Sequence, residues 1–141
     1  MSAQENAALA RRIYGAFNSR DYASALALTA DDAEFVIVPF NQRFHGTEGF
    51  DEFMRGFVAG FSDITVNLTN QVASDDQVVS EFIARGTHDG ELMTPAGAVP
   101  ATGRNVEYPV VEVWRVRGGR LTALYNYFDS ATVMRQLGLM P

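Results

Sequence analysis

Hydrophobic side chains recur at helical spacing in the first part of the chain. Residues 7–17 carry an apolar side chain at every third or fourth position, which predicts an amphipathic helix. Turn and capping residues follow at 18–21, and the pattern then predicts a shorter helix from Tyr22 to about Thr29. A second stripe, made mainly of phenylalanines, predicts a third helix over residues 47–61, with Thr47 as its cap. These apolar faces indicate helices that pack on a shared core.

The hydrophobic period changes to two residues in the remaining segments, which indicates strands. We expect strands at 34–40, 64–69, 77–88, 105–117 and 121–129, loops at 41–46 and 89–100, and a short closing helix at 130–137. Gly118 and Gly119 are a two-residue hairpin signal between the last two strands. The pattern predicts an α+β fold in one domain, residues 1–141, with helices packed on one face of a curved, mostly antiparallel sheet.

Composition and charge narrow the class of partner. The chain has 141 residues, a net charge of -6 and acidic and basic residues interleaved along its length, which argues against nucleic-acid binding. It has no cysteine, which is compatible with a reducing compartment. No secretion signal or apolar stretch of about 18 residues occurs, so we expect no membrane partner and a cytoplasmic location. Sixteen aromatic side chains favour a pocket for a hydrophobic small molecule.

Alternation along the last two strands selects candidate residues for that pocket. Residues 106–116 show one apolar row in which Glu112 is the only charged member, and we assign this row to the cavity. Tyr125, Tyr127 and Asp129 share one side of the returning strand, and we assign them to the cavity as well. A carboxyl group among aromatic rings has a raised pKa and can both take and return a proton, so Asp129 is a candidate general acid/base. The alternative is that Asp129 only caps the helix after it.

Other polar side chains leave their roles open. His88 follows a strand and is a candidate catalytic residue, or it satisfies a backbone group in its loop. Tyr14 can donate a hydrogen bond to a substrate carbonyl, or it packs with its hydroxyl group paired. Glu112 either pairs with Arg85 or Arg104 or lies in the cavity near Asp129. The sequence shows no metal-binding motif, so we expect no metal.

Several blocks of the sequence together resemble the SnoaL-like polyketide cyclase family of the NTF2-like superfamily. The blocks are HGTEGFDEFMRGF, FSDI, RGTHDGEL, the segment from TGRN to YNYFD, and RQLGL, which extend from about His45 to the C-terminus. The resemblance implies an NTF2-like cone, a homodimer formed through the sheet, and no metal or organic cofactor. It also implies that Asp129 acts as the acid/base in an intramolecular aldol closure and that His88 is the family's motif histidine.

The sequence therefore predicts a cyclase or isomerase that abstracts a proton alpha to a carbonyl group of a hydrophobic, polyketide-like substrate. The residues expected to contact the substrate are Tyr14, Phe53, Phe57, Phe82, Glu112, Trp114, Tyr125 and Tyr127. A small-molecule-binding protein without activity and a structural dimer with a collapsed cavity are the alternatives. Ketosteroid isomerase chemistry is disfavoured because the segment EFVIVPF offers no aspartate base. Epoxide hydrolysis is disfavoured because Phe82 and Ala84 stand where that reaction needs an arginine and an aspartate.

Overall fold

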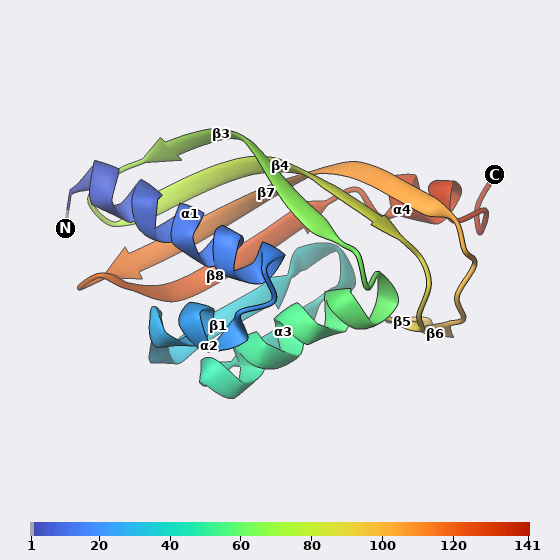
Figure 1. The fold of residues 1–141 in the computed structure, drawn as a ribbon, viewed down its shortest axis with the longest axis horizontal. Helices are drawn as coiled ribbons and strands as arrows, with labels where there is room; N and C mark the ends of the chain where they lie inside the picture. Colours follow the sequence, from blue (N-terminus) through green and yellow to red (C-terminus); the bar gives the residue numbers. More distant parts are fainter. Residues whose placement is uncertain (1) are drawn as a thin grey trace.

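Helices cover one face of a curved six-stranded sheet in the computed structural model, which describes residues 2–141 (Figure 1). The strand order is β2-β1-β8-β7-β4-β3. Strands β1 and β8 pair in parallel, and the other neighbours in this sheet are antiparallel. Helix α1 packs on β3 and β4, whereas α3 packs on β1 and β2. The expected α+β architecture, with a mostly antiparallel sheet, is confirmed.

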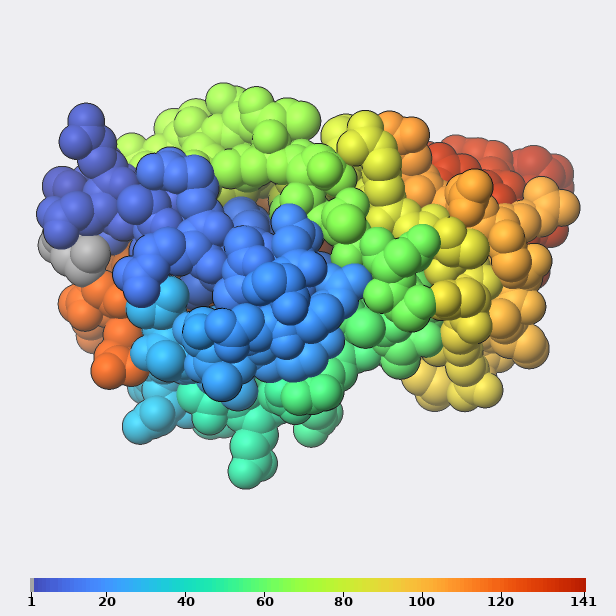
Figure 2. Space-filling model, in the orientation of Figure 1, coloured from blue at the N-terminus to red at the C-terminus, as the bar shows by residue number. Residues whose placement is uncertain are grey.

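The first three helices differ in how they begin, and only α1 and α2 have a side-chain cap. Helix α1 (Ala3–Asn18) has a capping box in which the side chains of Ser2 and Glu5 each accept a backbone N–H. Helix α2 (Tyr22–Ala27) is capped by Asp21, as the turn residues predict. Helix α3 (Gly46–Gly60) starts after His45 without a side-chain cap, so the expectation that Thr47 caps it is wrong. Figure 2 shows how these helices close over their face of the molecule.

The long strands agree with the segments that alternation marks to within about a residue, except that β1 begins earlier and ends before Val38 and that β3 extends to Ala73. They are β1 (Thr29–Ile37), β2 (Gln42–His45), β3 (Thr65–Ala73), β4 (Gln77–Thr87), β5 (Leu92–Thr94), β6 (Gly97–Val99), β7 (Asn105–Arg117) and β8 (Arg120–Phe128). A short 3-10 helix (Val38–Phe40) follows β1, and helix α4 (Ser130–Gln136) follows β8. The predicted loops at 41–46 and 89–100 instead contain β2 and the β5–β6 hairpin. These strands are too short for a period of two residues to be recognised.

The β7–β8 hairpin positions the polar residues of the site. Gly118 and Gly119 both have positive φ, 57° and 76°, as a two-residue primed turn requires, so the hairpin prediction is confirmed. A register shift lies between Arg115 and Val116. As a result Glu112 is opposite Asn126. The row of β7 from Val106 to Val116 that contains Glu112 faces the helices.

Within residues 2–141, none of the helices combines the length and the apolar character needed to cross a membrane.

Candidate functional site

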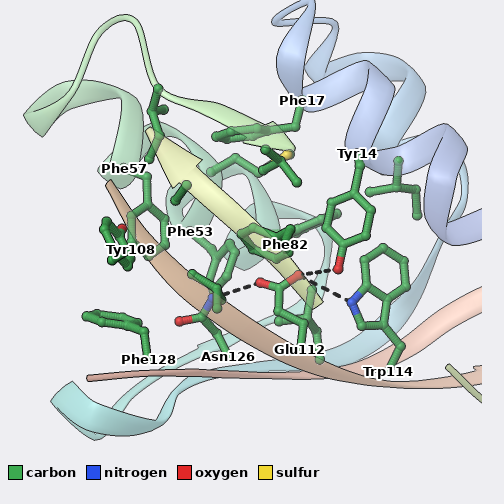
Figure 3. Close-up of a pocket in the computed structure, with 18 residues that line it drawn as sticks. Tyr14, Phe17, Phe53, Phe57, Phe82, Tyr108, Glu112, Trp114, Asn126 and Phe128 are labelled. Atoms are coloured by element: carbon green, nitrogen blue, oxygen red, sulfur yellow. Dashed lines mark hydrogen bonds between the residues drawn. The ribbon is translucent and has the colours of Figure 1, made fainter. Parts of the chain in front are cut away.

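A pocket lies between the inner face of the sheet and helices α1 and α3 (Figure 3). Its cavity volume is about 60 Å³, and about 560 Å³ is reached only when all space between the side chains and the opening to solvent is included. Aromatic and aliphatic side chains line most of it, and its polar atoms come from a few residues. Six of the eight predicted substrate-contact residues lie here: Tyr14, Phe53, Phe57, Phe82, Glu112 and Trp114. These six residues belong to helices α1 and α3 and to the central strands β4 and β7.

Glu112 is the charged residue of this pocket, and three neutral donors surround it. The Tyr14 hydroxyl donates to Oε1 at 2.7 Å, and the Trp114 indole Nε1 donates to the same oxygen at 3.3 Å. Asn126 Nδ2 donates to Oε2 at 2.8 Å. Figure 3 shows these bonds converging on one carboxyl group from α1, β7 and β8. Of the two alternatives for Glu112, the pairing with Arg85 or Arg104 is wrong, because Arg85 pairs with Glu107 and the bonds of Glu112 come from Tyr14, Trp114 and Asn126.

Burial sets the proton affinities in this network. Glu112 is 4 % exposed, and removal from water raises the pKa of its carboxyl group, although hydrogen bonds from Asn126, Tyr14 and Trp114 counteract part of the rise. Burial also raises the pKa of Tyr14, and the nearby Glu112 charge adds to this. Tyr14 consequently remains a hydrogen-bond donor near neutral pH. The Tyr14 hydroxyl group is paired with Glu112, which agrees with the alternative in which Tyr14 packs with its hydroxyl group satisfied within the protein.

The two carboxyl oxygens of Glu112 differ in their free acceptor capacity. Oε1 accepts two hydrogen bonds and Oε2 accepts one, whereas each carboxylate oxygen has two lone-pair sites. A lone pair of Oε2 is thus left for a proton or a ligand. A buried carboxyl group with a raised pKa and a free lone pair can serve as both general base and general acid.

Asp129 lies outside the pocket and caps α4. Its carboxylate accepts from the backbone N–H groups of Ala131 and Thr132 and from the Thr132 hydroxyl, and its side chain is exposed. These bonds, first of all the one from the Thr132 hydroxyl, hold the pKa of Asp129 below its ordinary value. The expectation of a carboxyl group buried among aromatic rings with a raised pKa is therefore wrong at this position, and the capping alternative describes it.

Tyr125 and Tyr127 face away from the pocket. They are opposite Val113 and Val111 on the outer face of the sheet, and Tyr127 is 45 % exposed. Their assignment to the cavity is wrong because the shift at Arg115 and Val116 moves the pairing by one residue. A shift of one residue exchanges the two faces of a strand. The pocket receives Leu124, Asn126 and Phe128 from β8 instead.

His88 is fully buried in the loop after β4, and it does not line the pocket. Its Nδ1 accepts from the Thr102 backbone N–H at 3.2 Å and is hydrogen-bonded to the Thr102 hydroxyl at 3.0 Å. Its own backbone N–H donates to Arg104 O, and its ring packs against Phe61. These contacts join the loop after β4 to the segment before β7. They agree with the alternative in which His88 satisfies a backbone group in its loop.

The sequence profile of SnoaL-like polyketide cyclases matches residues 7–137. The chain belongs to this family. Its fold is similar to that of IdmH from Streptomyces antibioticus, a candidate polyketide cyclase, with 30 % identity, a TM-score of 0.78 and coverage of 94 % of this chain and 97 % of IdmH. No protein in the curated set matches the chain significantly.

Two further solved structures have a similar fold. A candidate SnoaL-like polyketide cyclase from Jannaschia sp. CCS1 has 20 % identity, a TM-score of 0.87 and coverage of 99 % of this chain and 95 % of its own. AclR from Streptomyces galilaeus, a candidate hydroxylase, has 22 % identity, a TM-score of 0.82 and coverage of 99 % and 100 %. The NTF2-like cone is therefore shown, and the family supports a general cyclase or isomerase role.

Among the pocket residues that sequence reasoning missed in this SnoaL-like protein are Tyr108, Asn126 and Phe128. Tyr108 belongs to the row of β7 that was correctly assigned to the interior. Asn126 and Phe128 belong to the row of β8 that was assigned to the exterior. Asn126 stands out in the sequence as a single amide between Tyr125 and Tyr127. The face of the sheet on which its side chain lies depends on the register shift, which the sequence pattern does not show.

Proposed function

We propose that this SnoaL-like protein is a cyclase or isomerase that transfers a proton at the carbon alpha to a carbonyl group of a hydrophobic, polyketide-like substrate. Glu112 is the acid/base in this proposal. The observation that carries it is a buried carboxyl group with a raised pKa, held by three donors within an aromatic pocket. The protein's other strong candidate, Asp129, is exposed and engaged as a helix cap.

The proposed chemistry begins with Glu112 ionised. Oε2 removes the alpha proton, and the electron pair of the broken C–H bond forms an enolate. In a cyclisation the enolate carbon then forms a C–C bond to a second carbonyl carbon of the same molecule, and Glu112 returns the proton to the resulting alkoxide oxygen. In an isomerisation the proton returns to a different carbon. Proton transfer by a positioned group accelerates a reaction by about 10² to 10⁴-fold.

Tyr14 and Trp114 support this role by holding Oε1. Two donors on one oxygen fix the plane of the carboxyl group and leave the other oxygen as the reactive atom. The aromatic walls limit water and hold the reacting carbons close together, which contributes to the rate by proximity. These steps change no oxidation state, and the proton that is removed returns to the same molecule.

Two matched substitutions compare the two carboxyl groups. We predict that Glu112→Gln lowers proton exchange by about 10² to 10⁴-fold, because an amide cannot act as the base. Asp129→Asn keeps the exchange rate, because asparagine remains a good helix cap. The measurement is the loss of the alpha-proton NMR signal of β-tetralone in D₂O, and calorimetry shows whether each variant still binds the ketone.

The opposite pattern, with exchange lost in Asp129→Asn and kept in Glu112→Gln, assigns the reaction to Asp129 and contradicts the proposal. Binding of the ketone without exchange by the wild-type protein supports a small-molecule-binding protein without activity. Circular dichroism of both variants controls for loss of the fold.

A further inference from the structure

Asn126 lines the pocket, and its side-chain amide has a hydrogen-bond acceptor without a partner. Asn126 is 4 % exposed, and its Nδ2 is engaged by Glu112 Oε2 at 2.8 Å. Within the part of the chain that the structure describes, Oδ1 is buried and has no donor. Figure 3 shows this oxygen turned away from Glu112, on the side of Phe128.

When Glu112 is ionised, as at the start of the proposed reaction, it fixes this orientation. A carboxylate oxygen can only accept, so the nitrogen of the amide must face Glu112 and the oxygen must face the other way. A buried acceptor without a partner is costly, and unsatisfied groups of this kind in native proteins call for an explanation. A donor brought by the ligand supplies one.

We propose that Asn126 is a specificity-determining residue that accepts a hydrogen bond from a hydroxyl group of the ligand. This inference rests on the proposed function, because it places the ligand beside Glu112. Ligands with a phenolic or enolic hydroxyl group then bind in preference to ligands of the same shape without a donor. The neighbouring Phe128 and Tyr108 rings, with centroids 5.4 Å apart, provide an aromatic wall for the ring that carries the hydroxyl group.

Whether the pocket prefers a ligand with a hydroxyl group or one without it shows whether the pocket contains an unpaired acceptor. An apolar pocket without a partner for a hydroxyl group rejects it, because burial of an unpaired hydroxyl group is unfavourable. A pocket with a buried acceptor shows the reverse preference, because a ligand without a donor leaves that acceptor unpaired.

The test uses two single-ring probes of nearly equal size, p-cresol and p-fluorotoluene, and isothermal titration calorimetry. We expect the wild-type protein to bind p-cresol at least about tenfold more tightly. Asn126→Leu should remove or reverse this preference, whereas Asp129→Asn, at an exposed position outside the pocket, should retain it. Equal affinities, a preference for p-fluorotoluene, or no binding of either probe by the wild-type protein overturns the proposal.

Persistence of the preference in Asn126→Leu also overturns it, because Glu112 is then the acceptor. If Asn126→Leu does not fold, the carboxamide ¹³C signal of Asn126 in the wild-type protein decides the matter. It should move downfield with p-cresol and not with p-fluorotoluene, and an unchanged signal contradicts the proposal. Alpha-proton exchange by Glu112 is a separate measurement, so loss of the binding preference and loss of acid/base activity are distinguishable.

Discussion

Burial gives Glu112 and the exposed Asp129 opposite responses to pH. The pKa of Glu112 is raised by removal from water, and that of Asp129 is lowered by hydrogen bonds. The contribution of Glu112 to stability is fully present below its unfolded pKa, about 4.3, and is lost as pH rises through the folded pKa. The contribution of Asp129 is present above its unfolded pKa and is lost as pH falls through the folded pKa.

These signs give a prediction at the residue scale. The free energy of unfolding of the wild-type protein relative to Glu112→Gln should fall as pH rises from about 4 toward neutrality. The same difference relative to Asp129→Asn should fall as pH is lowered below about 4. Urea denaturation at a series of pH values measures both differences. A difference for Glu112→Gln that does not change with pH contradicts the raised pKa.

The sequence identifies Glu112 as an interior residue but leaves its hydrogen-bond partners open. Strict alternation over β7 suffices to place its side chain, because no bulge interrupts β7 between Asn105 and Arg115. Its hydrogen bonds come from Tyr14, Trp114 and Asn126, of which only Trp114 is near in sequence. Contacts between distant segments depend on helix placement and register, which local pattern does not contain.

At the scale of elements, the shift in the β7–β8 pairing decides the composition of the pocket. Counted back from the Gly118–Gly119 turn without a shift, Glu112 is opposite Tyr125, and the observed shift makes its partner Asn126. Alternation predicts the long strands, and helical spacing predicts the α3 stripe, because many residues contribute to each pattern. It fails for β2, β5 and β6, which have three or four residues each.

A second prediction concerns the loop that follows β4. Gly90 donates its backbone N–H to Gly60 O at the end of α3, and an added Cβ would lie 1.9 Å from Ala59 O. Gly90→Ala should therefore reduce the free energy of unfolding by about 1–3 kcal/mol, since the backbones must separate. Gly56→Ala is the control: its Cβ meets nothing within 4 Å and removes a helical glycine, so it should stabilise by about 0.5–1 kcal/mol. Chemical denaturation of both variants measures this, and a neutral Gly90→Ala contradicts the close approach.

At the scale of the whole molecule, the outer face of the sheet is the side opposite the pocket. Val111 and Tyr127 are paired there and are 36 % and 45 % exposed. The family resemblance implies a homodimer through the sheet, and we propose that this face forms it, because exposed apolar patches commonly mark interfaces. Its aromatic residues, which alternation assigns to the substrate, then contact the second copy.

This proposal predicts an effect on oligomeric state. Tyr127→Lys should convert a dimer into a monomer, because two buried ammonium groups would face one another across a symmetric interface. Met93→Lys, at a position that is 59 % exposed on β5, should leave the dimer intact. Light scattering during size-exclusion chromatography gives the mass. A wild-type monomer, or a Tyr127→Lys dimer of unchanged stability, contradicts the proposed interface.

The measurement that tests the central claim most directly is a ¹³C NMR titration of the side-chain carboxyl groups in the wild-type protein. The claim is that the proton-carrying carboxyl group is Glu112 inside the pocket and not Asp129 at the end of β8. We predict a midpoint above the ordinary glutamate value of about 4.3 for Glu112, and one below the ordinary aspartate value of about 3.9 for Asp129. A Glu112 midpoint at or below about 4.3, together with a raised Asp129 midpoint, contradicts the account.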